Sequence, residues 1–323
     1  MTERGRNQTI DVVRIVASFF VILCHIHLPG WAKDCSMGLA RFAVPFFLLV
    51  TGWYLFDGDD SRAYAMARRT LVSILKLTVL SVLLVAAVNT LVCLIRGRQM
   101  FSWVTGFFRR SGSWLLFLLY NRTHWLSSVM WYLFGLLYAL VIYLVLVRLR
   151  VLKYAFWLIP LLLILNIVRG EVLGKAWYYQ GNWLFTSLPF LLLGSLFRSS
   201  GWCTKIANRT AWWLIAAGIA ATCVEAYFFG EQIIHVGTLP LALGIFCLAV
   251  NGGETRWPAW LSYFGRRCTK YVFLLHCSLR DLVYALAGTP SGALLWLMPA
   301  FFFLLSGAIG WGISMIQDKR IKA

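Results

Sequence analysis

Charge is scarce in this chain, and acidic charge is the scarcest. Of its 323 residues only 13% are charged, and 12 acidic residues stand against 30 basic ones. A soluble domain of this length needs far more polar surface to cover its core. The scarcity of charge therefore excludes an ordinary soluble globular protein.

Several chemical signatures are also missing. The eight cysteines stand singly, most of them within apolar blocks, and no C-x-x-C pair occurs. We therefore expect neither a disulfide framework nor a metal site. The H-x-x-x-D, G-x-S-x-G and P-loop motifs are absent as well. The first apolar block lacks an A-x-A-like cleavage site, so we interpret it as a membrane span and not as a signal peptide.

Long apolar runs are what the chain has in abundance. Hydrophobic residues make up 60% of it and aromatic residues 16%, with a mean hydropathy of +0.75. Short charged runs separate the apolar blocks, a pattern typical of helices that cross a bilayer. We predict an all-α, polytopic integral membrane bundle of about ten transmembrane helices. The predicted spans lie near 9–28, 37–56, 70–95, 128–147, 151–168, 182–198, 212–229, 236–251, 270–288 and 293–316.

One segment between the spans differs from the others. Residues 100–126 mix aromatic side chains with arginines, as expected of a segment lying at the level of the lipid head groups. With no internal repeat or low-complexity linker, residues 1–323 are predicted to form a single membrane domain.

The basic surplus has a membrane explanation. The formal net charge is +18, and the basic residues cluster at the ends of apolar runs. They concentrate on the inner side when both termini are placed in the cytoplasm, as positive-inside topology requires. Contact with the lipid bilayer therefore accounts for the charge, and no nucleic-acid partner is predicted.

A polar seam runs along the first predicted span. Arg14 and His25 are eleven residues apart, which returns a helix to nearly the same face about 16 Å further along its axis. Asp11 and Ser18 join this face. Such a seam must face protein or a water-filled cavity, because lipid does not solvate it.

Two interpretations of this seam remain open. In the first, Asp11 and Arg14 form a structural ion pair and His25 is simply hydrogen-bonded within the bundle. In the second, His25 is a general base deep in the membrane, since imidazole exchanges protons near neutral pH. Arg14 would then bind a phosphate-bearing or carboxylate group.

Other polar residues fall within predicted spans. Glu225 could be the partner of Arg41 or Arg280, or it could bind a substrate hydroxyl or amine. His276 and Arg280 lie one helical turn apart, and the adjacent Asp281 could neutralise Arg280. This cluster is either structural or lines a substrate path.

Three segments carry a resemblance to a known family. TIDVVRIVASFFVILCH, RFAVPFFLLVTGWYLF and RCTKYVFLLHCSL resemble the first, second and late helices of membrane-bound acyltransferase family 3. The arginine and histidine of that first helix fall on Arg14 and His25, and the late histidine falls on His276. Within the family, MWYLFGLLYAL, NWLFTSLPFLLLGSLFR and VEAYFFG are similar to the membrane half of vancomycin-resistance serine racemases. The sequence ends at Ala323 without a racemase domain, so we do not expect racemisation.

The sequence departs from the family pattern at two places. Val72 stands where the second arginine of an R-x-x-R pair is expected, although Arg68 and Arg69 are present and Lys76 follows one turn later. Val129 stands where many relatives have a histidine.

The resemblance implies transfer of an acyl group, usually acetyl, from a cytoplasmic coenzyme A thioester to a hydroxyl of an envelope carbohydrate or its precursor. Acetyl-CoA would be a donor substrate, with no permanently bound cofactor, and the enzyme would lie in the bacterial inner membrane. The residues implied for catalysis are His25, Arg14 and Asp11. Those implied for donor binding are Arg68, Arg69 and Lys76. A possible substrate path would include Ser18, Arg41, Glu225, His276 and Arg280.

Polar residues within the membrane are also compatible with a second class of function, transport or sensing. A transporter or sensor module for a small amino acid such as serine would also need a polar pathway through the bilayer. The likeness to the racemase membrane half gives this alternative its specific form.

Overall fold

The chain folds into helices throughout the part that the structure describes. A computed structural model describes residues 7–56, 58–109, 113–123, 125–172, 180–230, 232–253 and 255–322, and no strand occurs among them. The helices are α1 (Gln8–Leu23), α2 (Trp31–Ala40), α3 (Ala43–Leu55), α4 (Asp60–Ile95), α5 (Ser102–Arg109), α6 (Ser113–Tyr120), α7 (Met130–Arg148), α8 (Leu152–Ala155), α9 (Leu158–Ile167), α10 (Leu188–Ser200), α11 (Trp202–Lys205), α12 (Asn208–Phe229), α13 (Thr238–Asn251), α14 (Ala259–Arg267), α15 (Thr269–Ala287) and α16 (Leu294–Lys322), with π-helical turns η2 (Val168–Val172) and η4 (Trp183–Ser187).

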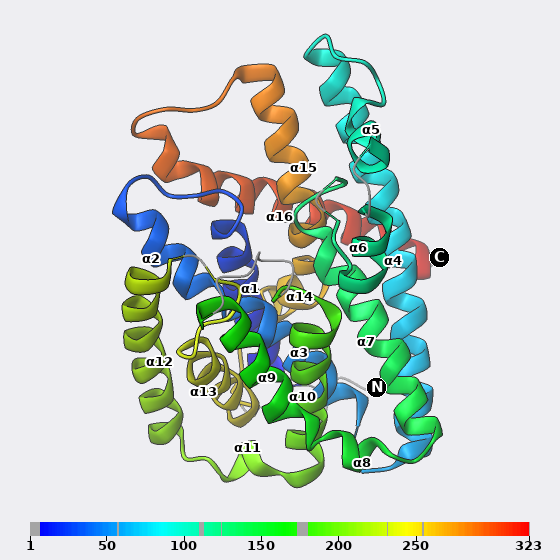
Figure 1. The fold of residues 1–323 in the computed structure, drawn as a ribbon, viewed down its shortest axis with the longest axis vertical. Coiled ribbons are helices and arrows are strands. Elements are labelled where there is room, and N and C mark those ends of the chain that lie inside the picture. The colour runs from blue at the N-terminus through cyan, green and yellow to red at the C-terminus, as the bar shows by residue number, and fades with distance from the viewer. Residues whose placement is uncertain are drawn as a thin grey trace.

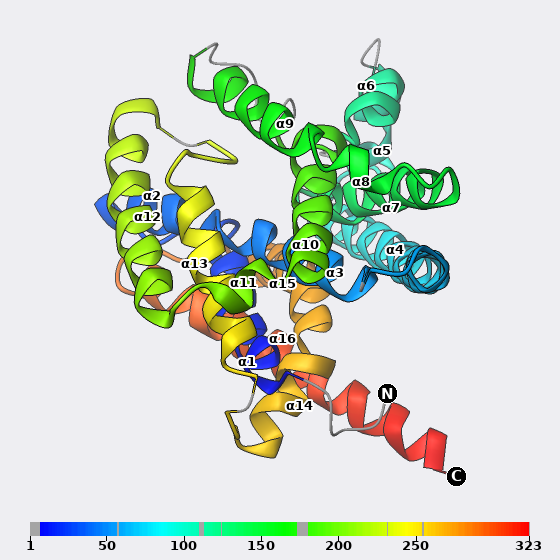
Figure 2. The same cartoon turned by 90° about the horizontal axis from the view of Figure 1, so that it is seen from below.

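The helices pack as neighbouring pairs. In Figures 1 and 2, α4 with α7 forms one side of the molecule and α12 with α13 the opposite side, while α3 and α10 lie between them. The first helix α1 packs against α14, α15 and α16, which come last in the chain. This closure brings the N-terminal and C-terminal polar residues within reach of one another.

Each predicted span overlaps at least one helix, but the count of about ten is not confirmed. Among the described residues, six helical segments are long and apolar enough to cross a membrane: Trp31–Leu55, Asp60–Ile95, Met130–Arg148, Leu152–Gly170, Asn208–Phe229 and Leu294–Lys319. The helices α1, α10 and α13 are shorter than 18 residues. The helix α15 has 19 residues but carries Lys270, Arg280 and Asp281.

Two predicted spans are interrupted by proline. The span predicted over 37–56 begins in α2, breaks at Arg41 and Phe42, and resumes as α3. Pro45 explains the break, because a proline ring clashes with the carbonyl four residues earlier, here that of Arg41. The span predicted over 151–168 is likewise divided between α8 and α9, and Pro160 lies four residues after the break at Phe156.

The long helix α4 begins at a well-formed cap. The Asp59 carboxylate accepts hydrogen bonds from the backbone N–H groups of Ser61 and Arg62 and from the Ser61 hydroxyl. These hydrogen bonds stabilise the ionised carboxylate and hold the pKa of Asp59 well below its ordinary value. The bond from the Ser61 hydroxyl has the largest effect. A capping aspartate at this position stabilises the first turn of the helix.

The segment predicted to lie at the membrane surface contains two short helices, α5 and α6. Residues 110–112 and 124 fall outside the described residues. The position of this segment relative to the lipid head groups stays a prediction.

Glycines allow α3 and α10 to pack very closely. A Cβ atom added at Gly52 would collide with the backbone carbonyl of Leu191, and one added at Gly194 would collide with that of Leu49. Small residues of this kind let helix backbones approach within a membrane, where packing drives association. Leu49 and Leu191, which lie at this contact, belong to the main hydrophobic core.

Candidate catalytic site

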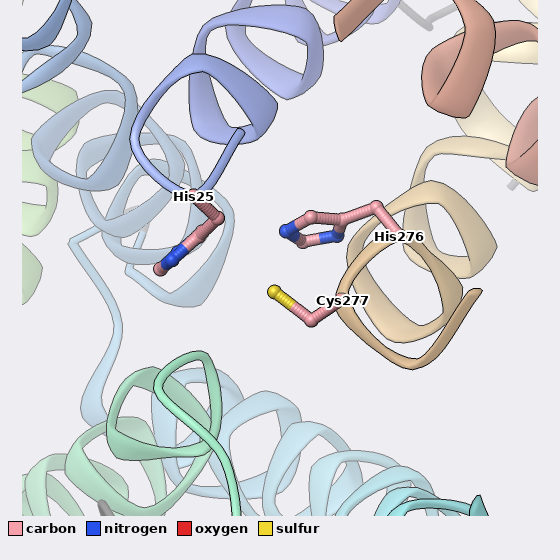
Figure 3. A group of neighbouring side chains, drawn as sticks. All are labelled: His25, His276 and Cys277. Carbon is pink, nitrogen blue, oxygen red and sulfur yellow. The ribbon is translucent and has the colours of Figure 1, made fainter. Parts of the chain in front are cut away.

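Three side chains with reactive atoms meet where the end of α1 faces α15. They are His25, His276 and Cys277 (Figure 3). The two imidazole ring centroids are 5.4 Å apart, with the ring planes inclined by 41°. One ligand-type atom from each residue lies within 4.8 Å of the other two. We call this group the histidine cluster.

His276 presents a free ring nitrogen to this cluster. Its side chain is buried, and its Nδ1 lies 2.8 Å from the carbonyl oxygen of Val272 one turn earlier. A carbonyl only accepts, so Nδ1 carries the proton and Nε2 keeps its lone pair. Nε2 is buried and has no hydrogen-bond partner in the described part of the chain. In Figure 3 the ring extends from α15 toward His25.

His25 is held from two other elements. Ser128 places its hydroxyl oxygen 3.3 Å from the Nδ1 of His25. Arg280 on α15 donates from Nη1 to the backbone oxygen of His25 at 2.7 Å, while its Nε and Nη2 donate to Asp281. The guanidinium therefore joins the end of α1 to α15, and the prediction that Asp281 neutralises Arg280 is confirmed.

The backbone at His25 differs from the continuous helix predicted over 9–28. The regular helix α1 ends at Leu23, and the N–H of His25 bonds to the carbonyl of Ile22 in a tighter turn. A turn of this kind satisfies backbone groups at a helix end. His25 thus lies on the last turn beyond α1, from which its side chain enters the cluster.

A cavity adjoins His25 on the side of α3. His25 and Arg41 both line it, together with Trp131 and Thr186. Arg41 lies at the break between α2 and α3, inside the candidate span Trp31–Leu55. The structure therefore brings together four of the residues predicted from sequence: His25, Arg41, His276 and Arg280.

The predicted Asp11–Arg14 ion pair is confirmed. Nη1 of Arg14 donates to Oδ1 of Asp11 at 2.9 Å, and the Asp11 side chain is only 3% exposed. The Asp11 backbone lies directly against Gly265 of α14, where no larger side chain fits. The pair thus lies where α1 and α14 pack, one end of the seam predicted to join Arg14 to His25.

Two predicted path residues lie elsewhere. Ser18 is buried and donates to the carbonyl of Ile15 in its own helix, which satisfies its hydroxyl. Glu225 pairs with neither Arg41 nor Arg280 within the described residues, so the expectation of an arginine partner is wrong. Its Oε2 instead accepts from the N–H of Gly237 at 3.0 Å and lies 3.8 Å from Nδ1 of His235. The turn from α12 into α13 supplies these closer partners.

The residues predicted to bind the donor lie on α4. Arg68, Arg69 and Lys76 all have exposed side chains. They do not join the histidine cluster, and their donor-binding role stays a prediction.

Sequence reasoning missed Cys277 and Ser128. The only signal for Cys277 was its position next to His276. Ser128 is 103 residues from His25 along the chain. The start of α7 meets the end of α1 in a bundle where α7 packs on α4, α4 on α15, and α15 on α1.

The geometry of the cluster suits proton transfer. The imidazole of His276 has a fixed tautomer and a lone pair on Nε2 that can accept a hydrogen bond, and the neighbouring imidazole lies close enough to share a bound hydroxyl. Two histidines and a cysteine are also metal-ligand types. The prediction that the chain has no metal site stays a prediction.

Comparison with known proteins gives one family. A family model described as an acyltransferase domain matches residues 7–316. Searches of curated proteins and of solved structures return no match. The matched range includes every residue of the histidine cluster and the Asp11–Arg14 pair.

Proposed function

The chain belongs to acyltransferase family 3, and from this premise we propose that it moves an acetyl group from coenzyme A to a hydroxyl of an envelope carbohydrate or its precursor. It is an acyltransferase acting on groups other than aminoacyl groups, and its apolar helices make it a multi-pass membrane protein. The finer assignment of donor, acceptor and bacterial inner membrane is our proposal.

One observation supports this proposal: the buried, unpaired Nε2 of His276 lies beside the half-buried ring of His25. In our mechanism His25 removes the proton of the acceptor hydroxyl. The oxygen then attacks the thioester carbonyl, the carbon–sulfur bond breaks, and the departing sulfur receives the proton as the coenzyme A thiol. His276 lies next to His25 as a second proton acceptor.

The donor is proposed to reach the cluster from the cytoplasmic side. Nine residues of α1 separate Arg14 from Leu23, a rise of about 14 Å, and His25 follows on the next turn. The extended pantetheine arm can bridge a gap of this size. The guanidinium suits a phosphate because it donates two parallel hydrogen bonds. Arg68 and Arg69 would add positive charge at the same side.

Substitution of His25 tests the proposal. His25→Gln keeps hydrogen bonding to Ser128 but cannot accept a proton near neutral pH. We expect acetyl transfer from labelled acetyl-CoA to isolated envelope glycan to fall by about 10²–10⁴-fold, the usual contribution of a general base. The melting temperature should stay at the wild-type value.

The same measurement separates catalysis from structure. A merely structural histidine would cost on the order of 1–3 kcal/mol of stability when its partner is left unpaired. Near wild-type transfer by His25→Gln would reject His25 as the base, and His276→Gln would then be tested in the same assay.

A second candidate function has one observation in its favour. Asp34, Arg41 and His235 line a cavity of about 250 Å³. Opposite charges in one cavity suit a zwitterionic amino acid, as a serine transporter or sensor would require. Proteoliposomes supplied with labelled serine and, separately, with acetyl-CoA and glycan distinguish the two functions. Serine flux without acetyl transfer would replace the acyltransferase proposal.

A further inference from the structure

A second cavity adjoins the residues that hold His25. It has a volume of about 410 Å³ and is formed by the end of α4, the start of α5, residues 125–128 and α15. This volume falls within the roughly 300–1,000 Å³ typical of small-molecule sites. We call it the α4–α15 cavity.

Two residues of its wall also hold His25. Ser128 lines the cavity and lies 3.3 Å from Nδ1 of His25. Arg280 lines it too and donates to the backbone oxygen of His25 at 2.7 Å. A molecule bound in this cavity is therefore separated from the proposed base by a single layer of side chains.

The opposite part of the wall is aromatic. Trp103 and Trp125 lie parallel, with ring centroids 6.2 Å apart and planes inclined by 1°. Both side chains are half-buried. The Nε1 of Trp125 is a buried donor with no partner in the described part of the chain. Flat aromatic surfaces beside hydrogen-bonding groups suit a ring that has an apolar face and polar edges.

The charges of the wall do not cancel. Arg280 is paired with Asp281 at 2.7 Å, whereas Arg96 is exposed at the rim with no acidic partner among the described residues. The lining therefore carries one uncompensated positive charge. A guanidinium at the edge of a partly desolvated cavity favours a ligand with a carboxylate or phosphate.

From these observations we infer that the α4–α15 cavity is the acceptor site and that it takes a sugar bearing an acidic group. The aromatic pair would contact the ring, Arg96 the acid, and Ser128 and Arg280 would face the hydroxyl directed toward His25. This inference rests on the proposed acyl transfer, but binding can be measured without that reaction.

The test uses two sugars that differ only in charge. Methyl β-glucuronoside carries a carboxylate, and its methyl ester presents the same ring hydroxyls without the charge. Each is titrated against the purified full chain in detergent while the melting temperature is followed, because a ligand that binds the folded state raises it. We expect the acid to bind about tenfold more tightly than the ester, which is the size of one charge-assisted hydrogen bond.

Matched variants locate the site. Arg96→Gln should abolish the preference for the acid and leave the ester titration unchanged. Arg98→Gln removes an equally exposed arginine two residues away and should retain the preference. Trp103→Leu should weaken the binding of both sugars, because it replaces the aromatic face with an aliphatic side chain.

Several outcomes would overturn the inference. Equal binding of acid and ester, or no binding of either sugar, rejects an acidic-sugar site. A preference that survives Arg96→Gln but is lost in Arg41→Gln moves the acid to the cavity beside α3. If the binding pattern holds while the glycan assay shows no acetyl transfer, the sugar site stands and the proposed reaction fails.

Discussion

At the scale of single residues, the polar groups of this chain divide into paired and unpaired ones. Asp11 with Arg14 and Arg280 with Asp281 form ion pairs, whereas the Nε2 of His276 has no partner among the described residues. An unpaired polar atom inside an apolar bundle costs free energy and is retained for a reason. The unpaired nitrogen of His276 therefore lies beside the end of the seam at His25, and the Asp11–Arg14 pair holds the guanidinium at its other end.

The role of Arg14 can be tested by keeping its charge. In Arg14→Lys the ammonium can still pair with Asp11 but cannot grip a phosphate with two parallel hydrogen bonds. We expect activity to fall by about 10–100-fold, as for the loss of one charge-assisted hydrogen bond. The measurement is the rate of acetyl transfer as a function of acetyl-CoA concentration.

Protein level and melting temperature serve as controls for that variant. Full activity in a normally expressed Arg14→Lys protein would show that Arg14 only anchors the end of the helix through Asp11.

At the scale of elements, local breaks place the side chains of the site. Pro45 separates α2 from α3 and so directs Arg41 to the cavity that it shares with His25. The early end of α1 at Leu23 puts His25 on a tighter turn. Helices that ran without interruption would point both residues differently.

The contact between α3 and α10 should tolerate no added methyl group. In Gly52→Ala the new Cβ meets the carbonyl of Leu191, so the two backbones must separate. Overpacking of this kind typically costs about 1–3 kcal/mol. We expect a lower melting temperature in detergent for Gly52→Ala.

A matched glycine gives the control. Gly312 lies on α16, and a Cβ atom added there would meet no other group within 4 Å. Gly312→Ala should therefore leave the melting temperature unchanged or slightly higher, because alanine favours the helix. Equal effects of the two substitutions would reject close backbone packing as the reason for Gly52.

At the scale of the whole molecule, the closure of the first helix onto the last three creates the site. The cluster combines His25 after α1 with His276 and Cys277 of α15, and Ser128 before α7 completes it. Because α15 also packs against α4, the same closure forms the α4–α15 cavity. The site therefore forms only when these helices pack together, because no single segment contains all of its residues.

The orientation in the membrane is testable with a natural cysteine. Cys35 is exposed on α2, in a segment predicted to lie outside, and Lys319 is exposed near the end of α16, predicted to lie inside. In intact cells an impermeant maleimide should label Cys35, and Cys35→Ser should remove that label. A cysteine placed at Lys319 in the Cys35→Ser background should react only after permeabilisation. Labelling at position 319 in intact cells would reverse the predicted topology.

The sequence by itself determined the class of molecule and part of the site. Apolar runs and their basic flanks indicate membrane helices because burial in lipid demands them, whatever the packing. The spacing of Asp11 and Arg14 places both on one face of α1 because helical periodicity is local, whereas His25, predicted on the same helix, lies on the turn after it. His276 and Arg280 followed from the same rule, together with the resemblance of three segments to one family.

Only the tertiary structure decided which of these residues meet. The contacts of His25 with Ser128 and Arg280 join positions 103 and 255 residues apart, and no local pattern encodes such a separation. Among the described residues, Glu225 contacts His235 and Gly237 and not an arginine, because the turn between α12 and α13 brings these two residues close to its carboxylate. Periodicity gives the face on which a side chain lies, whereas the packing of helices distant in sequence chooses its partner, because side-chain interactions act over a few ångströms of space irrespective of distance along the chain.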